Sequence, residues 1–318
     1  MIINVKNLNY VRYLVLGLCN YITYVNFVLL VCKFSVMIMK KNTVLYILTL
    51  LAFQTAVLAD NIIPFEVVNG LIVVEAEVDG KIGNYIIDSG SNGILLNGRA
   101  NSSEISYQTL TSSLEGSETK INSFKVGNFE AKELLGFATD LSTVETYLEK
   151  DVDGILGCSV FLPHSLIFDF TSSRLTISDK ELADADVHDF SRISFKMVEE
   201  LPLAKVKIDG ESYYFILDSG ASTHFIDQAI LSLDKHEVIP TGEIKSIYTA
   251  AGVSMNSKEY TFTNCEMGSE KLSLQAFSKD FSEVSDLLQI KIAGLISLSK
   301  LSSGKVYIDL DKNILYYQ

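Results

Sequence analysis

The chain has 318 residues, 48% of them hydrophobic, so it can bury a large core in one large domain or two smaller ones. Its 4 prolines, 19 glycines and lack of long low-complexity runs exclude collagen-like, linker and disordered classes. Residues 1–59 hold five of the 26 basic residues and no acid, which leaves 21 basic against 39 acidic side chains, a formal charge of −18. Because this charge repels nucleic-acid phosphates, we expect no nucleic-acid partner.

The first 59 residues are typical of a targeting region. Lys40 and Lys41 precede an apolar run over residues 44–53, and Val57-Leu58-Ala59 follows it, as in a signal peptide that is cleaved after Ala59. We therefore interpret residues 37–59 as a signal peptide and expect an exported protein, periplasmic or secreted. A retained membrane anchor is the alternative, although the run is short for a span of about 20 residues.

Residues 1–36 contain a second apolar stretch, residues 10–32, which is long enough to span a bilayer. Met37 and Met39 lie just before the lysine pair and are alternative translation starts. The stretch is therefore either an artefact of the assigned start or a real transmembrane helix, and the sequence leaves both open.

Cysteine and histidine spacing gives no sign of a disulfide framework or a metal site. Only Cys158 and Cys265 lie beyond the leader, and we expect two free, mostly buried thiols rather than a bridge. The four histidines lack ligand spacing, so we expect no metal or other cofactor and interpret His224 as a structural or surface residue.

From Ile62 onwards, short apolar runs separated by Gly, Asn, Asp and Ser predict a β protein with few helices. The first predicted hairpin joins residues 72–78 to residues 85–87 through Asp79-Gly80. The same plan returns 130 residues later, where Asp209-Gly210 joins residues 203–208 to residues 214–217.

A second block also repeats, at an offset of 140 residues. Residues 153–157, 167–170 and 174–177 correspond to residues 293–297, 307–310 and 313–316. The boundary between the copies is predicted near residues 179–189, an acidic stretch that suits an exposed linker. Residues 60–182 and 183–318 are therefore expected to be two copies of one β-rich lobe.

Each return strand runs directly into Asp-Ser-Gly, at residues 88–90 and 218–220. One such tripeptide occurs by chance roughly once in two thousand positions, but here both copies follow three apolar residues. A carboxylate at the end of a buried strand needs hydrogen bonds, which the following Ser and Gly can supply. If a pseudo-twofold axis brings the turns together, Asp88 and Asp218 share one proton and serve as base and acid on one water.

These motifs resemble the active-site loops of the pepsin and retropepsin families. Residues 88–96, Asp-Ser-Gly-Ser-Asn-Gly-Ile-Leu-Leu, look like the first loop of a two-lobed pepsin, and residues 218–223, Asp-Ser-Gly-Ala-Ser-Thr, are similar to the retropepsin loop. The resemblance covers nearly all of residues 62–318. It implies an all-β fold of two pseudo-twofold-related, β-barrel-like lobes with a cleft between them, in a two-lobed monomer without cofactor.

The resemblance also implies an aspartic endopeptidase that acts on a protein or peptide in extended conformation. Asp88 and Asp218 would be the catalytic pair. The supporting residues would be two serines that lock the loops together, two glycines that admit the tight turns, a strand glycine that packs beside the first loop, and a serine that could bond Asp88 from outside: Ser89, Ser219, Gly90, Gly220, Gly157 and Ser91. Ala221, at the place equivalent to Ser91, cannot form that bond.

The sequence departs from the family pattern in two places. Ser297 stands where the second copy should repeat Gly157, and we expect its larger side chain to crowd the loop of Asp218. The flap that should cover the substrate is assigned to residues 248–252, with Tyr248 as its candidate residue. Residues 114–117, with Tyr107 before them, are the poorer candidate in the first copy.

Two other functions are compatible with the sequence. A catalytically inactive relative would keep the cleft and bind extended peptides by strand addition, or glycans, without cutting them. A membrane-anchored structural or secretion-associated β protein is the other alternative, and it depends on residues 10–32 being real and retained. The presence of both aspartates favours the peptidase.

Overall fold

The computed structural model describes residues 61–98, 105–108, 113–179, 187–233, 235–249 and 254–318. The predicted leader (1–36), the predicted signal peptide (37–59) and the centre of the predicted lobe boundary (180–186) lie outside the described residues. Residues Asp60–Gln318 form one compact unit. Within the described ranges, no helix combines the length and the apolar character needed to cross a membrane.

The described part of the N-terminal half, residues 61–179, is mostly β-strand, as predicted. Its elements in chain order are β1 (Asn61–Val68), β2 (Leu71–Val78), β3 (Lys81–Asp88), β4 (Ile94–Asn97), β5 (Ile105–Gln108), β6 (Ser113–Val126), β7 (Phe129–Thr139), α3 (Ser142–Leu148), β8 (Gly154–Gly157), the 3-10 helix η1 (Cys158–Phe161), β9 (Ser165–Asp169) and β10 (Arg174–Ser178).

The described part of the C-terminal half, residues 187–318, is also mostly β-strand. Its elements are β11 (Ser191–Val198), β12 (Leu201–Ile208), β13 (Glu211–Asp218), β14 (His224–Asp227), α4 (Gln228–Leu231), β15 (Val238–Tyr248), β16 (Ser254–Met267), β17 (Glu270–Lys279), α5 (Ser282–Leu288), β18 (Ile292–Ser297), α6 (Leu298–Leu301), β19 (Lys305–Asp309) and β20 (Ile314–Tyr317).

The two predicted hairpins are confirmed. Strands β2 and β3 pair antiparallel around Asp79 and Gly80, whose φ angles are 49° and 80°. Strands β12 and β13 pair antiparallel around Asp209 and Gly210, with φ angles of 50° and 83°. Two successive positive φ angles are what a tight two-residue hairpin turn requires, and Asp-Gly tolerates them.

Beyond the hairpins, the strands of the two halves pair in the same order. In the N-terminal half β3 runs parallel to β8, and β4 lies between β8 and β7. In the C-terminal half β13 runs parallel to β18, and β14 lies between β18 and β17. In each half, the strand that ends in the aspartate therefore lies beside an apolar parallel strand, which is β8 in the first half and β18 in the second.

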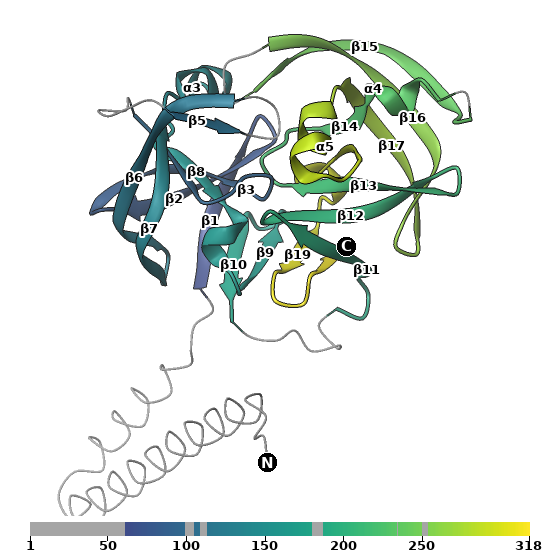
Figure 1. Cartoon of the computed structure of the whole chain (residues 1–318). Coiled ribbons are helices and arrows are strands. Elements are labelled where there is room, and N and C mark those ends of the chain that lie inside the picture. The colour runs from purple at the N-terminus through teal and green to yellow at the C-terminus, as the bar shows by residue number, and fades with distance from the viewer. Residues whose placement is uncertain (1–60, 99–104, 109–112, 180–186, 234, 250–253) are drawn as a thin grey trace, which may run out of the picture. The chain divides into compact units, whose positions relative to one another are not determined.

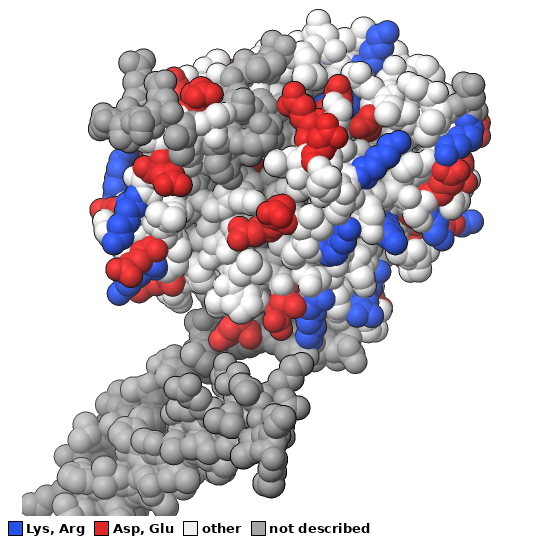
Figure 2. All heavy atoms as spheres, viewed as in Figure 1, with Lys and Arg blue, Asp and Glu red and all other residues white. Residues whose placement is uncertain are grey.

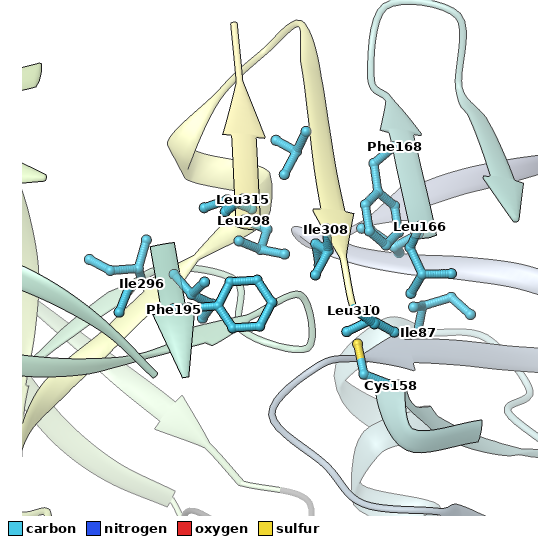
Figure 3. Packing of buried hydrophobic residues seen from close by; sticks show 14 of the residues in the cluster. Ile87, Cys158, Leu166, Phe168, Phe195, Ile296, Leu298, Ile308, Leu310 and Leu315 are labelled. Carbon is cyan, nitrogen blue, oxygen red and sulfur yellow. The ribbon is translucent and has the colours of Figure 1, made fainter. Parts of the chain in front are cut away.

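One antiparallel sheet joins the halves. Its strands follow the order β1, β10, β9, β19, β20 and β11, so that β9 of the first half pairs with β19 of the second. Figure 1 shows these strands below the rest of both halves. Side chains from this sheet and from both halves share one core, in which Ile308 and Leu310 lie between Phe168 and Leu298 (Figure 3).

Two smaller apolar clusters lie above this core, one in each half. The N-terminal cluster includes Leu71, Ile86, Leu95 and Ile155, and the C-terminal cluster includes their counterparts Leu201, Ile216, Phe225 and Leu295. The apolar pattern is therefore repeated in three dimensions as well as in sequence. Acidic and basic side chains are interspersed over the face of the molecule shown in Figure 2.

Two further predictions concern the cysteines and the flap of the first half. Cys158 and Cys265 are free and buried, as expected. The alternative flap at residues 114–117 lies at the start of β6, where Leu114 and Ser117 are buried, and it stays a prediction because the preceding residues 109–112 are outside the description. Tyr107 lies in β5, and its side chain is outside the description.

Candidate active site

The two Asp-Ser-Gly loops begin where β3 and β13 end, and four hydrogen bonds join them. The Ser89 hydroxyl accepts from the Ser219 N–H at 2.8 Å and donates to the Leu217 carbonyl at 2.9 Å. The Ser219 hydroxyl accepts from the Ser89 N–H at 2.9 Å and donates to the Ile87 carbonyl at 2.8 Å. Both serines are fully buried, so these reciprocal bonds fix each loop against the other without competition from water.

The carboxyl groups of Asp88 and Asp218 meet beside these serines. The Gly90 N–H donates to Asp88 Oδ1 at 2.8 Å, and the Gly220 N–H donates to Asp218 Oδ1 at 2.6 Å. A Cβ atom on Gly220 would lie 2.3 Å from Asp88 Cγ, so only glycine admits this approach. The two carboxyl groups lie close enough for each to shift the pKa of the other.

Their contact changes the protonation of the pair. Burial raises the pKa of Asp218 well above its ordinary value, and the charge of Asp88 raises it further. Burial also raises the pKa of Asp88, whereas hydrogen bonds from Asp218, Gly90 and Gly220 lower it in part. Because two adjacent carboxylates cannot both ionise easily, the pair holds one proton over a range of pH in which isolated aspartates hold none.

Gly157 occupies the predicted position beside the first loop. Its N–H donates to the Gly93 carbonyl at 2.7 Å, and a Cβ atom there would lie 2.3 Å from the Ser91 carbonyl oxygen. Ser91 itself donates its main-chain N–H to the Asp88 carbonyl at 3.2 Å. Among the hydrogen bonds of the described residues, its hydroxyl makes none to the Asp88 carboxyl.

The expected crowding at Ser297 is wrong. The side chain is fully buried, and its hydroxyl donates to the Ala221 carbonyl at 2.7 Å, in the loop of Asp218. The Ser297 N–H donates to His224 Nδ1 at 3.0 Å, whereas the N–H of Gly157 uses a main-chain carbonyl. The serine therefore ties strand β18 to the loop instead of displacing it.

His224 is structural, as predicted. As the acceptor for the Ser297 N–H, its Nδ1 atom must be unprotonated. Burial lowers the pKa of His224 to about 4, and the charge of Lys300 adds to this effect. The ring is therefore neutral near pH 7, and this hydrogen bond requires the neutral form.

A cavity of about 210 Å³ contains both aspartates. Apolar side chains from both smaller clusters line it, including Ile86 and Leu95 from the first half and Phe225 and Leu295 from the second. The surroundings of the carboxyl groups are thus mostly apolar on both sides. Small-molecule and peptide sites in proteins commonly have such apolar walls with a few polar groups.

The β15–β16 hairpin reaches over this cavity. Tyr248, the predicted flap residue, ends β15, is half exposed and lines the cavity. Its ring lies 5.8 Å from the ring of Tyr147, which belongs to α3 of the other half. Figure 1 shows β15 arching from the C-terminal half towards α3. The hairpin tip, residues 250–253, lies outside the description.

Among the described residues, no three His, Cys, Asp or Glu side chains gather in a way that could hold a metal ion. Comparison of the sequence with models of known protein families and with curated proteins found no match.

The reciprocal serine bonds predict a coupled loss of stability. Ser89→Ala leaves the Ser219 N–H and the Leu217 carbonyl buried without partners, and Ser219→Ala does the same to the Ser89 N–H and the Ile87 carbonyl. Each substitution should lower the free energy of unfolding by about 2 kcal/mol or more, and the double variant by less than the sum. Chemical denaturation measures this, with the exposed Ser273→Ala as a control that should change little. If Ser89→Ala and Ser219→Ala lowered the free energy of unfolding as little as the control does, the two hydroxyls would not hold the loops together.

The buried, neutral ring of His224 should make the free energy of unfolding fall in acid. The unfolded chain binds a proton at the ordinary histidine pKa of 6.5, whereas the folded protein does so only at about 4. The stabilisation is therefore complete above pH 6.5 and falls by about 3 kcal/mol as the pH drops to 4. His224→Asn keeps an acceptor oxygen that does not titrate, so the variant should lose less stability over this range. Parallel pH profiles for wild type and variant would show that His224 has no such role.

Proposed function

We propose that this protein is an aspartic endopeptidase of the two-lobed, pepsin- and retropepsin-like kind, with its active site between the halves. The observation that carries the proposal is the pair of Asp-Ser-Gly loops, joined by reciprocal serine bonds, whose carboxyl groups meet in one cavity. The repeated strand pairing and the sheet shared by the halves support the pseudo-twofold arrangement that such an enzyme needs.

The chemistry follows from the shared proton. The ionised carboxylate of the pair takes a proton from a water molecule as that water attacks the peptide carbonyl. The protonated carboxyl hydrogen-bonds the carbonyl oxygen and stabilises the charge that develops on it. The proton then reaches the leaving amine, so neither aspartate can serve alone. Gly90 and Gly220 hold the two groups in place by their main-chain N–H donors.

An extended substrate fits the strands around the cavity. Among the described strands, β15 pairs only with β16, which leaves its other edge able to hydrogen-bond a peptide main chain. The apolar residues on both sides of the carboxyl pair can receive alternate side chains of that peptide. The leader interpreted as a signal peptide is compatible with an exported enzyme.

Asp88→Asn and Asp218→Asn should each reduce cleavage of an unfolded protein by roughly a thousandfold or more, since each removes one member of the acid–base pair. The double variant should lose little more, because the residues act as a unit. Asp227→Asn is the matched control, since Asp227 is buried but caps α4 outside the cavity. A peptide with a hydroxyl in place of the scissile carbonyl should inhibit.

Full activity in either single variant would rule out the shared mechanism. A wild-type protein that cleaves nothing from acidic to neutral pH, yet binds extended peptides or glycans, would instead identify a catalytically inactive relative. Circular dichroism of each variant separates loss of chemistry from loss of fold.

A further inference from the structure

One residue in the wall of the cavity breaks the repeat between the halves. Lys279 ends β17 and is paired in register with Asp227 of β14. Its counterpart by register is Thr139, which ends β7 and pairs with Asn97. The Thr139 hydroxyl donates to the Glu115 carbonyl at 2.9 Å and is thereby satisfied. In the C-terminal half, a long cationic side chain takes the place of this small polar one.

Lys279 is buried in the wall of the active-site cavity. Only 4% of its surface is exposed, and it lines the same cavity as Asp88 and Asp218. Alternation along β17 places it on the face of Phe277, which belongs to the apolar cluster of the C-terminal half. Its side chain therefore leaves the strand on the apolar face that contributes to the cavity wall.

No partner for this amine exists within the described structure. The centroid of the Phe281 ring lies 6.0 Å from Nζ, and the described residues give this amine no hydrogen bond and no ion pair. Burial lowers the pKa of Lys279, although the exposed side chains of Asp280 and Glu283 partly oppose this. A lysine that lines a cavity and has no partner of its own is available to a carboxylate of a bound ligand, because the ion pair would then be completed by that ligand.

We propose that Lys279 forms an acid-selective subsite, which binds a carboxylate of the peptide substrate in the C-terminal part of the cavity. This inference rests on the proposed peptidase function. Phe225, Leu288 and Leu295 line the same cavity and can receive the aliphatic part of a glutamate or aspartate side chain, while its carboxylate meets the amine. A free C-terminal carboxylate has the same chemistry and is the alternative source. A neutral side chain of the same shape leaves the ammonium unpaired and is therefore disfavoured.

The test uses peptides that differ only in Glu, Gln or Leu at one position, scanned over four positions on each side of the cleaved bond. One set of these peptides has amidated C-termini, and a second, otherwise identical set has free C-termini. At pH 6, wild type should prefer Glu to Gln in kcat/KM by at least roughly tenfold at one position. If the free terminus is the source, the preference should appear instead between the free and amidated sets.

Lys279→Met should abolish that preference and raise kcat/KM for the Leu peptides, since the ammonium that disfavours them is gone, whereas Lys279→Arg should retain the preference for Glu. Lys245→Met is the matched control, because Lys245 is an exposed lysine over the Phe277 ring that does not line the cavity. It should keep the preference, which separates the subsite from general attraction of acidic peptides.

The inference is overturned if wild type shows no preference for a carboxylate in either set, or if Lys279→Met keeps the preference. If wild type cleaves none of the peptides, the peptidase proposal fails. The same peptides are then compared by affinity, and equal affinities for Glu, Gln and free-acid peptides would overturn the subsite as well.

Discussion

Two buried serine hydroxyls hold the candidate active site together. Ser89 and Ser219 each accept an N–H from the other loop and donate to the carbonyl that precedes the other loop's aspartate. The arrangement of the carboxyl groups therefore depends on main-chain atoms at the ends of β3 and β13. Those strands are in turn fixed by their parallel neighbours β8 and β18 and by the sheet that joins the halves.

The halves repeat the same framework, and the C-terminal half adds polar contacts of its own. In the N-terminal half, the loop and its parallel strand meet through Gly157, which leaves no room for a side chain. In the C-terminal half, Ser297 and His224 make the equivalent contact through a hydroxyl and an imidazole ring. Tyr248 and Lys279 also come from the C-terminal half. A symmetric framework thus carries an asymmetric cavity, as binding an extended chain with a direction requires.

The sequence was sufficient to predict the features that depend on local chemistry. Asp-Gly turns require positive φ angles, and alternation of apolar residues defines the strands, so both hairpins were predicted correctly. The paired Asp-Ser-Gly motifs also indicated that Asp88 and Asp218 belong to one site. The roles of Ser297 and Lys279 were not predicted, because each depends on which atoms approach it from elsewhere in the chain. The lysine could have been identified by comparing the two copies at the ends of β7 and β17, where Lys279 stands in the place of Thr139.

The shared proton of Asp88 and Asp218 can be observed directly. Carbon-13 NMR titration of the aspartate carboxyl groups, assigned with Asp88→Asn, measures this directly. One carboxyl of the pair should stay protonated well above the pH at which the exposed aspartates ionise. In Asp88→Asn, the pKa of Asp218 should fall, because the charge of its neighbour is gone. Ordinary, independent titration of both groups in the wild-type protein would show that they do not share a proton.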